Sequence, residues 1–186
     1  MEDLKKDARN FLIELIETPS FSREEENTAL IIEKYLKQKN IPFQRKMNNI
    51  WAKNLHFDAG LPTILLNSHH DTVKPNSAYT KNPFEALEKD GKIFGLGSND
   101  AGASLVSLWA VFTFFYNKKL KYNLIYAATA EEEISGKNGV CSILTDLGKI
   151  NFAIVGEPTK MDLAIAEKGL VVLNCVAKGT ASHAAH

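Results

Sequence analysis

The sequence predicts an α/β fold built on a mixed, largely parallel sheet with helices on its faces. Short apolar runs at residues 63–67, 123–129 and 152–155 alternate with helical patterns, which is typical of such folds. The first of these runs, at residues 63–67, suits a strand that is buried in a sheet. With 186 residues and 45% hydrophobic content, the chain is long enough to bury one such core and to begin a second domain.

Two helices are expected before the first strand. Apolar residues recur at helical spacing between residues 4 and 16, and Pro19 ends that helix. Ser22 and Glu25 have the spacing of a capping box, so a second helix is expected to begin there and to end near Pro42.

Further elements follow the first strand. Residues 86–94 contain an Asp-Gly turn, which predicts a hairpin. A loop with spaced glycines follows at residues 95–100. Residues 103–116 are apolar on all sides, which indicates a largely buried helix, and another helix is expected at about 136–147.

Near residue 163 the pattern changes to strand-like runs that Lys-Gly pairs interrupt. We therefore assign residues 1–165 to one α/β domain and residues 166–186 to the beginning of a second. The chain stops directly after an apolar run, so we expect it to be part of a longer protein whose α/β domain is incomplete here.

Charge and composition exclude several classes of partner. The chain has 22 Lys and Arg residues against 22 Asp and Glu residues, so no strong field attracts nucleic acid or an anionic membrane. No apolar run approaches the ~18 residues of a membrane-spanning helix, and the N-terminus is charged. Cys141 and Cys175 stand in apolar contexts and are expected to be reduced core residues, which predicts a cytoplasmic protein.

Metal-ligand side chains follow each apolar strand-like run. His69 and Asp71 follow the first, residues 131–133 are three glutamates after the second, and Glu157 follows the third. Open α/β sheets bind ligands at the carboxyl ends of their strands, and Asp100 in the glycine-rich loop can reach the same place. Carboxylates that lie close together repel one another unless a cation joins them. An imidazole with carboxylates favours zinc, with cobalt or manganese as substitutes.

Spacing predicts roles for two pairs of residues. His69 and Asp71 are two residues apart, so on a continuing strand their side chains share a face, and Asp71 can accept a hydrogen bond from the ring nitrogen that does not bind metal. Glu132 and Glu133 are adjacent, which suits a division of labour in which one coordinates metal and the other takes a proton from water.

Each motif alone also has an ordinary structural interpretation. The sequence around His69 is compatible with a simple turn, Asp100 with a helix N-cap, and the consecutive glutamates with a solvated helix start. We favour the joint metal-site interpretation because every apolar strand ends in ligand-type residues. His70 would face away from His69 and is not expected to be a ligand, and His56 is expected to lie on the surface.

Four runs, at residues 68–73, 95–100, 129–133 and 155–158, resemble in order and spacing the successive motifs of the M20 metallopeptidase family. The resemblance implies a zinc-dependent exopeptidase-like fold with two zinc ions per site in the complete protein. It assigns the metal ligands and the catalytic groups as follows: His69 and Glu157 on one zinc, Asp100 bridging both, Glu133 on the second, Glu132 as general base and Asp71 orienting His69.

Residues 178–184 resemble the start of that family's α+β lid or dimerisation domain. The resemblance implies that His183 helps to stabilise the oxyanion, often in the active site of a partner subunit, so a homodimer is expected. His183 and His186 otherwise form only an HxxH pair at the end of the chain. The family's last metal ligand, a distant C-terminal histidine, has no counterpart among these residues, and a lysine common after the bridging aspartate is absent after Asp100.

The expected function is zinc-dependent hydrolysis of the amide bond of an N-acyl amino acid, of the acetylornithine deacetylase type. A dipeptidase and a succinyl-diaminopimelate desuccinylase are the enzymatic alternatives. A non-catalytic metal-binding or self-associating fragment is a rival of a different class, and these 186 residues alone are expected to be inactive. A phosphate-binding loop at residues 95–102 is disfavoured, because no Lys-Ser or Lys-Thr follows the glycines.

Overall fold

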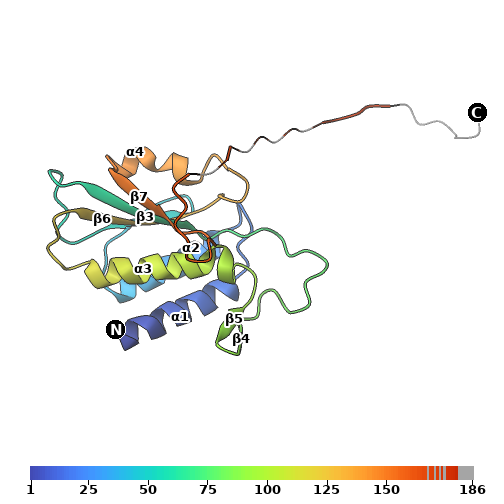
Figure 1. Ribbon diagram of the computed structural model, residues 1–186, viewed down its shortest axis with the longest axis horizontal. Helices are drawn as coiled ribbons and strands as arrows, with labels where there is room; N and C mark the ends of the chain where they lie inside the picture. The colour runs from blue at the N-terminus through green and yellow to red at the C-terminus, as the bar shows by residue number, and fades with distance from the viewer. Residues whose placement is uncertain (167, 170, 172, 174, 180–186) are drawn as a thin grey trace, which may run out of the picture.

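The computed structural model describes residues 1–166, 168–169, 171, 173 and 175–179. Figure 1 shows an α/β body from which the last described residues extend away as an irregular segment. The elements in chain order are α1 (Glu2–Ile16), α2 (Glu26–Gln38), β1 (Gln44–Lys46), β2 (Asn49–Lys53), β3 (Thr63–His69), β4 (Leu87–Lys89), β5 (Lys92–Phe94), η1 (Ser98–Gly102), α3 (Ala103–Phe115), β6 (Asn123–Thr129), η2 (Val140–Ser142), α4 (Leu144–Leu147) and β7 (Phe152–Val155).

Five strands form one mixed sheet in the order β1-β2-β6-β3-β7, which confirms the predicted fold class. β3 is parallel to both β6 and β7, whereas β2 runs antiparallel to β6 and to β1. The register pairs His69 with Thr129 and Asn67 with Val155. The loops that leave β3, β6 and β7 therefore begin at the same edge of the sheet.

Helices cover both faces of the sheet, as Figure 1 shows. Alternate residues along β6 point to opposite faces: Tyr126 packs into the larger core with α1, α2 and α3, and Ile125 packs into the smaller core with α4. The larger core contains an aromatic cluster, in which the Phe11 ring stacks on Tyr35 at 4.2 Å and meets Trp109 edge to face at 5.5 Å. Burial on both faces explains why β3 and β6 are continuous apolar runs. The edge strand β7 is also an apolar run, but its residues are exposed.

The hairpin, the helix that begins at Ala103 and the two N-terminal helices confirm their predictions, except at one helix boundary. α3 is buried on one side only, because Val111 and Phe114 are 44% and 41% exposed, so the expectation of a largely buried helix is wrong.

α2 begins at Glu26, and neither its N-cap residue Glu25 nor Ser22 makes the predicted capping contact. The Ser22 hydroxyl instead donates to Asp71, and the Glu25 carboxylate accepts from the backbone N–H of Arg23. The antiparallel strands β1 and β2 were not predicted, because β2 is buried on both faces and carries no periodic pattern.

The predicted helix at 136–147 is wrong in extent. The structure has only the short turn η2 and the single turn α4 there, because the backbone N–H of Asn138 donates to Glu131 and ties the segment to the preceding loop. Cys141 and Cys175 are exposed, so the expectation that they belong to the core is wrong.

Of the described residues beyond 162, none lies in a strand. The domain boundary at residue 165 therefore stays a prediction. Within the described part of the chain, no helix has the length and apolar character needed to cross a membrane.

Candidate metal centre

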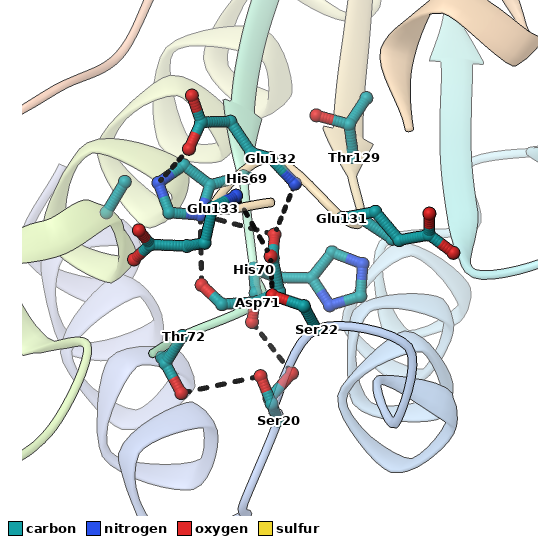
Figure 2. Close-up of polar contacts among 12 residues, drawn as sticks. Ser20, Ser22, His69, His70, Asp71, Thr72, Thr129, Glu131, Glu132 and Glu133 are labelled. Atoms are coloured by element: carbon teal, nitrogen blue, oxygen red, sulfur yellow. Dashed lines mark hydrogen bonds and ion pairs between the residues drawn. The ribbon is translucent and has the colours of Figure 1, made fainter. Parts of the chain in front are cut away.

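The candidate site lies where the loops that follow β3, β6 and β7 meet the turn η1. His69 is the last residue of β3, and its side chain is 1% exposed. Asp100 lies within η1, immediately before α3, and Glu157 follows β7. Glu132 and Glu133 lie in the loop after β6, and both extend on the His69 side of that loop (Figure 2).

Three carboxylates surround one nitrogen of His69. Its Nε2 atom lies 3.2 Å from Oδ1 of Asp100, 3.7 Å from Oε2 of Glu157 and 3.8 Å from Oε2 of Glu132. One potential ligand atom from each of His69, Asp100 and Glu157 lies within 4.8 Å of the other two. Three separate segments of the chain thus bring metal-ligand atoms together, as the strand-end argument predicts.

The other ring nitrogen of His69 is held by Asp71. Nδ1 lies 2.9 Å from the backbone oxygen of Asp71 and 3.4 Å from its carboxylate Oδ1. The backbone carbonyl is therefore the nearer acceptor, where the sequence predicted the carboxylate. An acceptor at Nδ1 places the proton there and leaves Nε2 directed at the three carboxylates, which is the tautomer that a metal ligand needs.

Asp71 also fixes the glutamate loop. Its buried carboxylate accepts hydrogen bonds from the backbone N–H of Glu132 at 3.0 Å and of Glu133 at 3.2 Å, and from the hydroxyl of Ser22 at 2.7 Å. Figure 2 shows Asp71 between the glutamate loop and the segment that carries Ser22. Sequence reasoning missed this contact of Ser22, because the residues are 49 positions apart and Ser22 resembled a helix cap.

The charges of the site do not balance without a cation. Burial disfavours a charged ring, yet the hydrogen bonds and charges of Asp71 and Glu157 outweigh it and raise the pKa of His69 to about 11. Partial burial raises the pKa of Glu132 and, together with the neighbouring Asp100, also that of Glu133. An imidazole nitrogen with several close carboxylates is a donor set that zinc, cobalt or manganese accepts, so the residues present fit a divalent metal.

The three consecutive glutamates do not share one role. Glu131 is buried and points away from Glu132 and Glu133 (Figure 2), and it accepts a hydrogen bond at 2.9 Å from the side chain of Asn138. Glu133 lies outside the cluster formed by the three possible ligands and, with Asp100, borders an open pocket of about 250 Å³. Residues 131–133 form a turn, so the alternative interpretation of these glutamates as a solvated helix start is wrong.

The remaining histidines fall into three groups. His70 points away from His69, as predicted, and is buried with its ring nitrogens 2.9 Å from Thr28 Oγ1 and 2.8 Å from the Asn48 carbonyl. Burial lowers the pKa of His70. His56 is exposed, which confirms the prediction for it. His183 and His186 lie outside the described residues.

Comparison with known proteins adds sequence relatives. A model of peptidase family M20/M25/M40 matches residues 65–172. An acetylornithine deacetylase from Buchnera aphidicola subsp. Schizaphis graminum is 32% identical over 149 residues, covering 80% of this chain and 38% of that protein. A succinyl-diaminopimelate desuccinylase from Rickettsia felis is 30% identical over 197 residues, covering 95% of this chain and 52% of that protein. The chain thus spans about 38% to 52% of the length of these two relatives.

Solved structures share the fold. An M20 family metallo-carboxypeptidase from Sulfolobus solfataricus superposes with a TM-score of 0.66 at 22% identity, over 80% of this chain and 37% of that one. A dinuclear metal-binding peptidase of the M20 family from Bacillus subtilis gives a TM-score of 0.64 at 20% identity, over 83% of this chain and 43% of that one.

Proposed function

This chain belongs to peptidase family M20/M25/M40, and we propose that the protein containing it is a metal-dependent amidohydrolase acting on an N-acyl amino acid. One observation carries the proposal: His69, Asp100 and Glu157 present three ligand atoms within 4.8 Å of one another, and a carboxylate that is not needed as a ligand, Glu132, lies 3.8 Å from the same nitrogen. Structural metal binding alone does not require that additional carboxylate.

The proposed ligands are His69 and Glu157 for one ion, Glu133 for a second, and Asp100 as the bridge between the two. Zinc is the proposed metal, with cobalt or manganese as substitutes. A divalent cation in this place would polarise the amide carbonyl and favour deprotonation of the attacking water. The three carboxylates around Nε2 of His69 support this assignment, because a cation between them would offset their mutual repulsion.

Glu132 is the proposed general base. Partial burial raises its pKa, and Glu157 and Asp100 raise it further against the opposing charge of His69, so its carboxylate is a better proton acceptor than an exposed glutamate. Glu132 would take a proton from the attacking water and return it to the leaving amine. His183 is proposed as a donor to the oxyanion, and Asp71 as the residue that orients His69.

The substrate class rests on the relatives. A deacetylase and a desuccinylase are among the similar proteins, which supports removal of an acyl group from an amino acid. A dipeptide is the second candidate, because human carnosine dipeptidase 1 shares the fold with a TM-score of 0.63 over 84% of this chain. A homodimer in the cytoplasm is proposed for the whole protein, with no nucleic acid or membrane as a partner.

The test combines metal content with turnover in the full-length protein. Zinc stoichiometry is measured alongside hydrolysis of N-acetyl amino acids, N-succinyl amino acids and dipeptides, for wild type, Glu132→Ala and Glu132→Gln. We expect both variants to keep their zinc and to lose ~100-fold to 10,000-fold in kcat, as removal of a general base does. A wild type that binds no zinc, or variants as active as wild type, would overturn the proposal in favour of a non-catalytic fragment.

A further inference from the structure

Four consecutive backbone N–H groups after β6 donate to side-chain oxygens from other segments of the chain. They are the N–H groups of residues 130–133, called here the amide row. Their acceptors are Asn49 Oδ1 for Ala130 at 3.0 Å, Glu25 Oε1 for Glu131 at 3.3 Å, Asp71 Oδ1 for Glu132 at 3.0 Å and Asp71 Oδ2 for Glu133 at 3.2 Å. The backbone that carries Glu132 and Glu133 is thus held by side chains rather than by a helix or strand.

Glu25 is the unusual member of this set. Its side chain is 1% exposed, and no Lys or Arg forms an ion pair with it among the residues that the structure describes. Its carboxylate instead accepts from the backbone N–H of Arg23 at 2.5 Å and from the Asn48 side chain at 2.9 Å, besides Glu131. A buried carboxylate is costly unless hydrogen bonds satisfy it, so a carboxylate kept here without a cation indicates a specific use.

We propose that Glu25 is a positioning residue that sets the place of Glu132 and Glu133 relative to His69. This inference rests on the proposed function, because it concerns the residues assigned to proton transfer and metal binding. Glu131 is held at two points, through its N–H by Glu25 and through its side chain by Asn138. Glu131 is turned away from the site, and the next two side chains leave the loop on the His69 side, as Figure 2 shows.

Loss of the Glu25 carboxylate would affect a distant part of the chain. Its contact with Glu131 joins residues 106 positions apart, between the segment before α2 and the loop after β6. Removing the carboxylate leaves the Glu131 N–H buried without an acceptor, and the loop then keeps its contacts with Asn49, Asp71 and Asn138. A displacement of ~1 Å at a catalytic group can cost ~100-fold in rate.

The experiment compares Glu25→Ala with Glu25→Gln in the full-length protein. Hydrogen exchange of a peptide covering residues 130–138 reports the loop directly, and kcat and KM are measured at saturating zinc. For Glu25→Ala we expect faster exchange in that peptide and a kcat lowered ~10-fold to 100-fold with a smaller change in KM. Glu25→Gln keeps one oxygen that can accept from both backbone N–H groups, so it should restore most of the protection and of the kcat.

Asn123→Ala is the matched control. Asn123 is equally buried at the opposite end of β6, where its side chain accepts from Asp58 N at 2.9 Å and donates to Asp58 O at 2.7 Å. It should lower stability without changing exchange at residues 130–138 or kcat. Unchanged exchange there in Glu25→Ala, or an equal loss of kcat in Asn123→Ala, would overturn the inference. If wild type hydrolyses no substrate, the proposed function fails, and the exchange measurement still decides whether Glu25 positions the loop.

Discussion

Oδ1 of Asp71 accepts a hydrogen bond from the backbone N–H of Glu132 at 3.0 Å and lies 3.4 Å from Nδ1 of His69. One fully buried carboxylate therefore contacts both the proposed metal ligand and the backbone of the proposed base. The relative position of these two groups depends on a single side chain, which makes Asp71 more than an orienting partner for the imidazole.

The substitution Asp71→Asn tests this double role. The amide group replaces one acceptor oxygen with a donor, which must then face the N–H of Glu132, the N–H of Glu133 or the hydroxyl of Ser22. We expect zinc affinity to fall ~10-fold to 100-fold and the free energy of unfolding of the metal-free protein to fall by about 1–3 kcal/mol. Zinc titration and urea denaturation measure the two effects.

The control for Asp71 is Asp146→Asn, which removes an exposed carboxylate that pairs with Lys46 at 2.9 Å. This change should leave zinc affinity unaltered and shift the unfolding free energy by less than about 1 kcal/mol. Equal zinc affinities for wild type and Asp71→Asn would show that Asp71 does not set the geometry of the site.

Zinc binding should release a proton from His69. In the metal-free protein the pKa of His69 is raised to about 11, so the ring is charged at neutral pH, whereas a metal ligand must be neutral. Affinity should therefore rise with pH, by ~10-fold per unit between about pH 6 and 8 if one proton is displaced. Calorimetry in two buffers of different ionisation enthalpy measures the proton count, and a count of zero at pH 7 would contradict the raised pKa.

His70 should instead make the fold sensitive to acid. Burial holds the pKa of His70 below its usual value of 6.5, so the unfolded chain takes up a proton there more readily than the folded chain. The stability that this neutral ring contributes is present above about pH 6.5 and is lost as the pH falls toward the lowered folded pKa. The unfolding free energies of metal-free wild type and His70→Gln should converge as the pH falls, and a gap that stays constant between about pH 7 and 5 would refute this.

How far the sequence predicts the structure depends on the range of the interactions. Local periodicity locates α1 and α3, and the Asp90-Gly91 pair adopts the left-handed backbone of the predicted turn. Apolar runs locate β3 and β6 because both faces of the sheet are covered. No periodic pattern marks β2, because it is buried on both faces of the sheet.

For the candidate site, too, the sequence predicts some contacts and misses others. The strand-end argument predicts that His69, Asp100 and Glu157 meet, because parallel strands fix that edge of the sheet. The four hydrogen bonds of the amide row join residues 61 to 106 positions apart. Both Ser22 and Glu25 resemble helix-capping residues in the sequence. Only the packed structure distinguishes a helix cap from an acceptor for a distant N–H group.

The position of Asp100 should depend on the absence of a side chain at Gly102. A Cβ atom at Gly102 would lie 2.6 Å from the carbonyl oxygen of Gly97 and 2.9 Å from Leu12 Cδ1. The same Gly97 carbonyl accepts a hydrogen bond from the Gly102 N–H at 2.9 Å, and this bond closes the turn that carries Asp100. Gly102→Ala must therefore displace this turn, and we expect zinc affinity to fall ~10-fold or more and the unfolding free energy to fall by about 1–3 kcal/mol. Gly60→Ala is the control, since its Cβ would lie 3.3 Å from the Asp58 side chain. Gly60 precedes the first residue of β3, whereas His69 is the last residue of that strand. If Gly102→Ala binds zinc as tightly as wild type, the close approach of Gly97 and Gly102 does not position the proposed bridging ligand.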